Sequence, residues 1–183
     1  MSTAAQLVDA VVLDQPPRSM PPWRAVVAFW MENEGKWLKS WYIGWGEPFC
    51  FRCGWLAPVS DHGIPHDDPT TYVYAMWDRA SCWLDRAHLR DRVYGGPDTA
   101  DNMVALCHLC HDQMTRGWDA PTRDKGLEFV QAGEPCDMLW QVYTDDRLMG
   151  KRASRSTLFK ARTQFVELML RAHTAGPTEG GAA

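Results

Sequence analysis

Two Cys-x2-Cys pairs constrain this chain more than any other feature of its sequence. The first pair is Cys50 and Cys53, and the second is Cys107 and Cys110. Each pair can form the tight turn that brings two sulfur atoms to one side of the backbone, and four thiolates are a tetrahedral ligand set that zinc prefers. We therefore expect the chain to fold around a structural zinc ion that joins two segments far apart in sequence.

Residue types that serve in catalysis lie between and just after these pairs. His88 ends the segment LDRAH, Asn102 follows a loop that contains Gly95-Gly96-Pro97-Asp98, and His111 comes directly after Cys110. A histidine titrates near neutral pH, so each one could move a proton or bind a metal ion. The ordered series His88, Asn102, His111 therefore indicates more than a purely structural zinc site.

The residues between His88 and Cys107 have clear local preferences. Val93 and Tyr94, like Val104 and Leu106, are β-forming residues that suit a short hairpin. The segment Gly95-Gly96-Pro97-Asp98 supplies turn conformations between them. A short hairpin is therefore expected here.

In order and spacing, these residues resemble the HNH endonuclease family, over residues 50–117. The resemblance implies an α+β fold, with a ββα-metal core stapled by the four-cysteine zinc site and flanked by α-helices. In this core it implies strands over residues 82–89 and 103–107, a loop over 90–102 and a helix from 108 onward. It also implies a metal-dependent endonuclease that hydrolyses DNA phosphodiester bonds and leaves 5′-phosphate and 3′-hydroxyl ends. DNA is then the expected partner.

The resemblance also implies a role for each residue. His88 would be the general base, because histidine as a residue type can take up a proton near neutral pH. Asn102 would pin the loop and so aim His88. His111 would hold a catalytic divalent ion, Mg²⁺ or Mn²⁺, with Ni²⁺ or Zn²⁺ as alternatives. Arg86 would position the phosphate, as in the similar Asp-Arg-Gly-His stretch of non-specific ββα-metal nucleases, and Arg90 is a second candidate substrate contact.

One residue departs from the family pattern. Many members carry Asp or His directly before the catalytic histidine as a second metal ligand, and this chain has Ala87 there. Alanine coordinates nothing. Either His111 holds the ion together with water and phosphate, or a carboxylate such as Asp85 or Asp112 reaches it.

Other histidines and cysteines have simpler interpretations. We expect His108 to face solvent or contact phosphate, and Cys82 and Cys136 to be reduced, buried thiols. The segment Asp61-His62-x3-His66-Asp67-Asp68 could bind a metal ion. Its flanking prolines and glycine instead favour an exposed loop after the first cysteine pair.

Composition narrows the class of protein. The net charge of −4 is unusual for a nucleic-acid binder, but residues 151–171 carry six Lys or Arg against one acid, which predicts a local basic face. Cysteines used for metal binding favour a reducing compartment, and the N-terminus lacks a signal peptide's basic region. No apolar run is long enough for a membrane span. We expect a cytoplasmic protein. Whether it binds a protein partner or a second copy of itself stays open.

The chain divides into five expected segments. They are a loose leader (1–20), a helical, Trp-rich segment (21–49), the HNH core with its zinc site (50–117), a helical segment (118–174) and a disordered tail (175–183). Helices are expected over about 23–33, from Thr122 to about 132, and from Ser154 or Ser156 to about 172. The ten tryptophans could stack on bases, but core packing is the favoured interpretation. The last helix could cover the core or contact phosphate.

Two further classes of function remain open at this point. A non-catalytic, zinc-stabilised DNA-binding module would keep the cysteines and the basic helix without needing His88 or His111, and Ala87 favours it. A zinc-ribbon adaptor for another protein would explain the acidic net charge and the tryptophans. The intact His88, Asn102, His111 series favours the enzyme.

Overall fold

The structure is a computed structural model that describes residues 19–33, 43–136, 140–141 and 155–174. Most of the expected leader, the tail, and Trp37, Trp41 and Tyr42 lie outside these residues. The described elements are, in chain order, α2 (Trp23–Glu32), α3 (Pro69–Arg79), η1 (Ala80–Cys82), β1 (Leu84–His88), η2 (Arg92–Tyr94), η3 (Ala100–Asn102), β2 (Met103–Cys107), α4 (His108–Gly117), α5 (Arg123–Gln131) and α7 (Arg155–Thr174). The coarse expectation of a mixed α and β fold around a four-cysteine cluster is confirmed.

The centre of the fold is a two-stranded antiparallel hairpin. β1 pairs with β2 in a register that runs from Leu84 opposite Cys107 to His88 opposite Met103. Both expected strands are therefore confirmed, and α4 begins directly after β2, as expected. The segment that contains the first cysteine pair lies along the other edge of β2, where the Phe51 amide donates a hydrogen bond to the Ala105 carbonyl at 2.8 Å.

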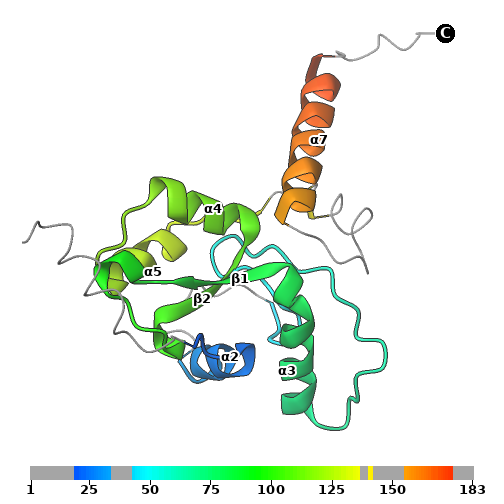
Figure 1. Cartoon of the computed structure of the whole chain (residues 1–183). Coiled ribbons are helices and arrows are strands. Elements are labelled where there is room, and N and C mark those ends of the chain that lie inside the picture. The colour runs from blue at the N-terminus through cyan, green and yellow to red at the C-terminus, as the bar shows by residue number, and fades with distance from the viewer. Residues whose placement is uncertain (1–18, 34–42, 137–139, 142–154, 175–183) are drawn as a thin grey trace, which may run out of the picture.

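Helices cover the hairpin on both sides. In Figure 1, α4 lies on one side of the two strands and α2 on the other. The Trp30 side chain ties α2 to the hairpin, because its buried indole Nε1 donates a 2.6 Å hydrogen bond to the Met103 carbonyl. Every residue of β2 is buried, and this agrees with a strand sequence that is apolar throughout instead of alternating between apolar and polar residues.

Aromatic rings fill the space between α2, α3 and the first cysteine pair. Trp77 lies within 6.2 Å of the ring centroids of Trp23, Trp45, Phe49 and Phe51. Every tryptophan among the described residues is buried or packed against the core. The core interpretation is therefore confirmed for the tryptophans among the described residues.

Helix α3 was not expected from the sequence. Pro69 begins it, and the Asp68 carboxylate caps it by accepting hydrogen bonds from the Thr70 and Thr71 amides. Proline is favoured in the first helical turn, where its missing N–H costs nothing. The proline that seemed to mark a loop thus marks a helix start, and Met76 and Trp77 of this helix enter the core.

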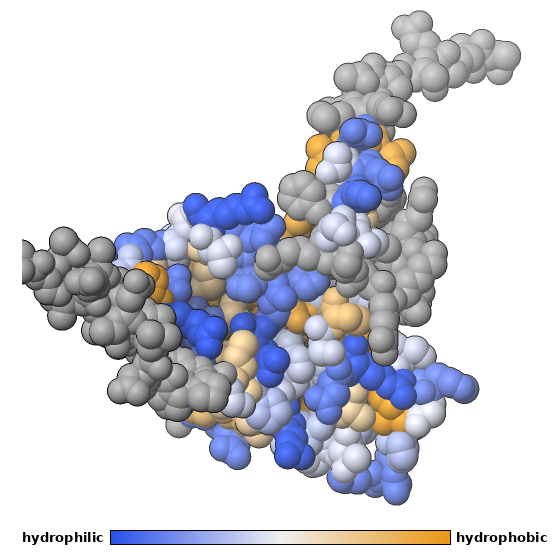
Figure 2. Space-filling model, in the orientation of Figure 1, coloured by the Kyte–Doolittle hydropathy of each residue, from blue (hydrophilic) through white to orange (hydrophobic). Residues whose placement is uncertain are grey.

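The expected helices after the site are present. Thr122 caps α5 by accepting a hydrogen bond from the Lys125 amide, as predicted. Helix α7 projects from the rest of the described structure (Figure 1), anchored by Phe165, whose ring lies 5.4 Å from that of Trp140. Val166 and Leu168 on this helix are exposed, and apolar side chains are visible along it in Figure 2. None of the described helices has the length and apolar character that a membrane span requires.

The loop between the strands differs from the expectation in one respect. Val93 and Tyr94 do not extend the hairpin but form a short 3-10 turn, with 77% and 41% of their surfaces exposed. The turn ends at Gly95, whose φ of 77° is a left-handed conformation that suits glycine. The β-forming preference of these two residues is overridden because neither contacts the core.

Candidate metal centre and active site

The first cysteine pair lies in a tight turn. Its ends are closed by hydrogen bonds from the Cys50 amide to the Trp55 carbonyl at 2.9 Å and from the Gly54 amide to the Cys50 carbonyl at 2.8 Å. Gly54 has a φ of 70°, which glycine adopts without steric cost. The turn therefore holds the backbone of this pair before any ion is considered.

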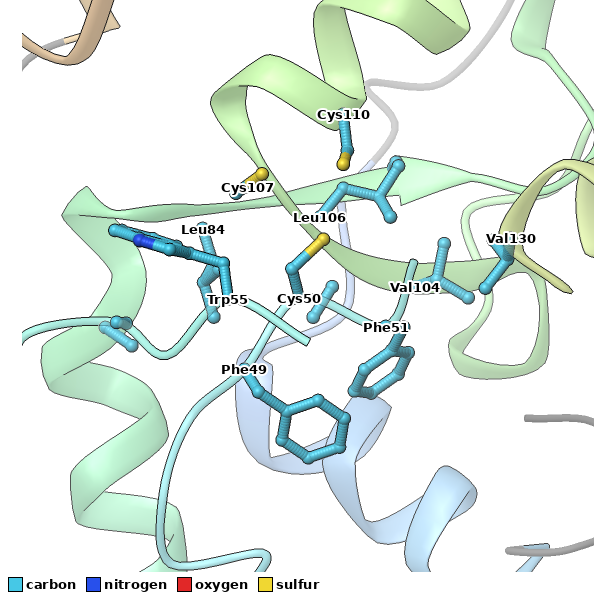
Figure 3. Close-up of a cluster of buried hydrophobic side chains, with 14 of the residues drawn as sticks. Phe49, Cys50, Phe51, Trp55, Leu84, Val104, Leu106, Cys107, Cys110 and Val130 are labelled. Carbon is cyan, nitrogen blue, oxygen red and sulfur yellow. The ribbon is translucent and has the colours of Figure 1, made fainter. Parts of the chain in front are cut away.

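The second pair lies at the start of α4. Cys107 is the N-cap of the helix and Cys110 lies in its first turn. Residues three apart at a helix start lie on the same side, so both sulfurs face the first pair. Figure 3 shows the side chains of Cys50, Cys107 and Cys110 directed toward a common point between the turn and the helix.

The four sulfur atoms form one cluster. All lie within 4.8 Å of one another, and this is the one set of three or more potential ligands found among the described residues. Burial disfavours the Cys50 thiolate, but hydrogen bonds from Cys107, Cys110 and Cys53 outweigh burial and hold the pKa of Cys50 well below its usual range. The pKa of Cys107 is instead raised, through its hydrogen bonds to Cys110 and Cys50.

Hydrogen bonds from the neighbouring sulfurs thus favour the thiolate form of Cys50. Four thiolates at this separation repel one another unless a cation lies between them. A divalent ion with a preference for sulfur, such as zinc, would neutralise that repulsion and suit the four-sulfur set. The donor set therefore fits the expected structural zinc ion.

A second group lies beside the cluster, between β1 and α4. The Asp85 carboxylate oxygen Oδ2 accepts hydrogen bonds from Nδ1 of His108 at 2.8 Å and from Nδ1 of His111 at 2.9 Å. Burial acts to raise the pKa of Asp85, but these two imidazoles outweigh it and hold the pKa well below its ordinary range. In a neutral His111 ring that donates from Nδ1, the lone pair lies on Nε2.

His108 does not face solvent, contrary to the expectation from the sequence. Only 9% of its side chain is exposed, and its Nε2 lies 3.2 Å from the Cys82 carbonyl oxygen in addition to the Asp85 contact. It therefore braces β1 against the start of α4. Cys82 and Cys136 are half-buried rather than buried, and neither forms a disulfide with another described cysteine. The Cys82 sulfur lies against the Arg79 carbonyl.

His88 is at the end of β1 and belongs to a third group. Its Nε2 lies 2.7 Å from Oδ1 of Asp98, in the loop between the strands. The other carboxylate oxygen of Asp98 accepts a hydrogen bond from Arg92 at 3.0 Å. Burial acts to raise the pKa of Asp98, but the bonds from His88 and Arg92 outweigh it, and the pKa is lowered.

Asn102 holds this loop closed. Its Oδ1 accepts a hydrogen bond from the Arg90 amide at 2.9 Å, while its Nδ2 donates to the carbonyls of Arg90 at 3.2 Å and Pro97 at 2.9 Å. Only 1% of its surface is exposed. The Asn102 side chain thus connects the residues that follow His88 with the residue that precedes Asp98, as expected of an asparagine that pins the loop.

The remaining predicted positions have varied surroundings. Ala87 is buried opposite Val104 in the hairpin. The Arg86 guanidinium donates to the Pro21 carbonyl and lies 5.6 Å from the Trp23 ring, so it secures the start of α2. Arg90, in contrast, is exposed. Asp112 lies 3.6 Å from Arg116 on α4.

The alternative metal-binding segment is exposed, as expected. Asp61 and His66 are 3.8 Å apart, with 57% and 64% of their side chains accessible. His62 is exposed, and Asp68 is used as the cap of α3. These residues do not form a compact set of potential ligands. The segment is therefore a solvent-facing loop that leads into a helix.

A groove of about 1050 Å³ lies on another side of α4. Its lining includes Arg52, Arg116, Phe129, Trp140 and Arg162, but neither His88 nor His111. Arg52 is already engaged there, with its guanidinium 4.0 Å from the centre of the Phe129 ring. The groove therefore lies apart from both histidine groups.

The sequence did not single out Asp98 or His108 as members of these groups. Asp98 is one of several acids in the loop, and only the folded loop selects it as the partner of His88. His108 lies between two cysteines, where a position in the first turn of a helix can face either solvent or β1.

No family model, curated protein or solved structure matches this chain. Its function must therefore be argued from the geometry of the three groups.

Proposed function

We propose that this chain is a metal-dependent endonuclease of the HNH type that hydrolyses DNA phosphodiester bonds. The observation that supports it most is the position of three side chains on one strand, loop, strand and helix unit. His88 ends β1, Asn102 closes the loop before β2, and His111 lies in α4. This is the order of roles that the HNH resemblance implies.

His88 is the general base in this proposal. As a water oxygen forms its bond to phosphorus, the water loses a proton to the imidazole of His88, and the bond from phosphorus to the 3′ oxygen breaks. The 3′ oxygen takes a proton from solvent, which gives a 3′-hydroxyl and a 5′-phosphate. With 12% of its side chain exposed, His88 is largely shielded yet reachable from the surface.

His111 is the proposed ligand of the catalytic divalent ion. Its Nδ1 contact with Asp85 directs the Nε2 lone pair away from that carboxylate, a tautomer that suits metal binding. Asp85 then acts by orienting His111, with direct coordination as the alternative. A bound Mg²⁺, Mn²⁺, Ni²⁺ or Zn²⁺ would neutralise charge that develops on the phosphate.

Substrate contact is assigned to Arg90 before Arg86. Arg90 is exposed directly beside the loop that holds His88, and its guanidinium can bind phosphate oxygens. Arg86 would have to give up its hydrogen bond to Pro21 and its contact with Trp23 to do the same. The four-cysteine cluster, loaded with zinc, serves as the staple between α4 and the turn at Cys50.

The test is cleavage of supercoiled plasmid and of single-stranded DNA by the zinc-loaded protein. Reactions contain EDTA, Mg²⁺, Mn²⁺ or Ni²⁺, and compare wild type with His88→Ala and His111→Ala. His62→Ala is the matched control, because it removes an exposed histidine from a loop outside the site. We expect metal-dependent cleavage that both site variants lose and His62→Ala retains, with equal zinc content throughout.

Ala87 supports one alternative, a zinc-stabilised module that binds DNA without cutting it. That module would retain DNA in a salt-dependent manner in all three variants and cut in none of them. Cleavage that survives His88→Ala would refute the assigned base. A protein that neither binds nor cuts DNA would favour the adaptor function instead.

A further inference from the structure

The strongest unused feature of the site is the Asp98 carboxylate. It lies in the loop between the strands, with 7% of its side chain exposed, and it makes a 2.7 Å contact with Nε2 of His88, itself 12% exposed. The contact joins two ionisable groups that are largely shielded from solvent, so it bears directly on the role proposed for His88.

The loop is built to hold Asp98 in this place. Asn102 donates to the carbonyl of Pro97, the residue directly before Asp98. Gly96 donates from its amide to the Asp91 carbonyl at 3.0 Å, and a Cβ at Gly96 would lie only 1.9 Å from the Arg90 carbonyl oxygen. Only glycine permits this close fold-back, which returns the chain toward the end of β1.

Arg92 fixes the carboxylate from the other side. It donates to Oδ2 of Asp98 at 3.0 Å, while Oδ1 faces His88. The two oxygens therefore have separate tasks, and the group cannot rotate without breaking a charge-assisted bond. Because Asp98 has a lowered pKa, it is an ionised acceptor at neutral pH, so the hydrogen of this contact belongs to His88 Nε2.

This arrangement sets the chemistry of the imidazole. With the hydrogen held on Nε2, the lone pair of the neutral ring lies on Nδ1, which is the atom that can accept a proton from water. A carboxylate in this position also stabilises the imidazolium that forms when the proton arrives.

We propose that Asp98 is the positioning residue of the proposed endonuclease: it holds His88 in one orientation, with Nε2–H directed at the carboxylate and Nδ1 as the general base. The proposal rests on the function assigned to His88. Asp98 acts through His88 and does not itself contact the substrate. Arg92 serves it by locking the carboxylate.

The first arm of the test does not depend on nuclease activity. A proton NMR spectrum of the zinc-loaded protein should contain a downfield signal from His88 Nε2–H, protected from solvent exchange by the Asp98 contact. The signal is assigned by its absence in His88→Ala. We expect it to persist in Asp101→Asn, a charge change in the same loop, and to vanish in Asp98→Ala. A signal that survives Asp98→Ala, or is absent from wild type, overturns the dyad.

The second arm measures cleavage by Asp98→Asn and Asp98→Glu, again beside Asp101→Asn and with zinc content and unfolding midpoint matched. We expect kcat to fall about 10²- to 10⁴-fold in Asp98→Asn with little change in KM, and to recover in part in Asp98→Glu. In a His88→Ala background, Asp98→Asn should not lower kcat further, because the two residues act as a unit.

The outcomes separate the two proposals. A wild-type protein that does not cut DNA refutes the endonuclease, and the role of Asp98 as a positioning residue falls with it, while the NMR arm still reports the dyad by itself. The role of Asp98 is refuted if Asp98→Asn and Asp101→Asn lower cleavage equally. It is also refuted if adding Asp98→Asn to His88→Ala lowers cleavage further. Either result leaves the endonuclease proposal intact.

Discussion

Replacing Asn102 with alanine tests whether one buried side chain holds the loop of the site. The substitution removes three hydrogen bonds, to the Arg90 amide, the Arg90 carbonyl and the Pro97 carbonyl. Each such bond contributes about 0.5–1.5 kcal/mol net, and a buried group left unpaired costs more. Water can replace part of the lost hydrogen bonding at Arg90, which is exposed. We expect Asn102→Ala to lower the free energy of unfolding by about 2–3 kcal/mol.

The assay is urea unfolding of the zinc-saturated protein. We expect the midpoint to shift with an unchanged dependence on urea, which would assign the change to stability rather than to the unfolded state. Asn102→Asp keeps the size of the side chain but faces its charge toward two carbonyl oxygens, and should be at least as destabilising. Asp101→Ala, at the neighbouring position, is the control. The reasoning would be refuted if Asn102→Ala lowered the free energy of unfolding by less than about 1 kcal/mol, or by no more than Asp101→Ala does.

Three further measurements address other parts of the structure. Trp30→Phe should lower the free energy of unfolding by about 2–4 kcal/mol in the same urea assay, because it removes the hydrogen bond to the Met103 carbonyl at a fully buried site. Gly126→Ala should destabilise, since its Cβ would lie 2.0 Å from the Leu89 carbonyl oxygen; Gly117→Ala, with open space, should be neutral or stabilising by about 0.5–1 kcal/mol in thermal unfolding. Removal of zinc by a chelator should abolish cooperative unfolding. The affinity for zinc, measured in a competition titration, should rise from pH 6 to pH 8. The raised pKa of Cys107 keeps this thiol protonated without the ion, so zinc binding releases a proton and is favoured as pH rises. Equal affinity at both pH values would contradict that last expectation.

The elements of the central unit were predictable because each has a local cause. The cysteine spacing requires two turns that bring sulfurs together, and β2 is a run of apolar residues that ends at a helix start. Thr122 as the cap of α5 is a similar local signal. These features depend on neighbours in sequence, so the sequence contains enough information to predict them.

Helix α3 was missed although it has local signals. Asp68 and Pro69 are a cap and a first-turn proline, but Thr70, Thr71, Tyr72 and Val73 are residues that favour strands. Packing decides the conflict, because the helix buries Met76 and Trp77 in the aromatic core. That burial depends on α2 and the first cysteine turn, which are distant in sequence.

The sequence by itself determined the candidate residues: four cysteines able to hold one metal ion, and a histidine, an asparagine and a histidine in a fixed order. Only the tertiary structure decided which acids serve them. Asp98 contacts His88 because the glycine-containing loop folds back, and Asp85 contacts His108 and His111 because α4 packs on β1. Hydrogen-bond partners require contact within about 3 Å, and such contact between segments far apart in the chain is set by packing rather than by local sequence.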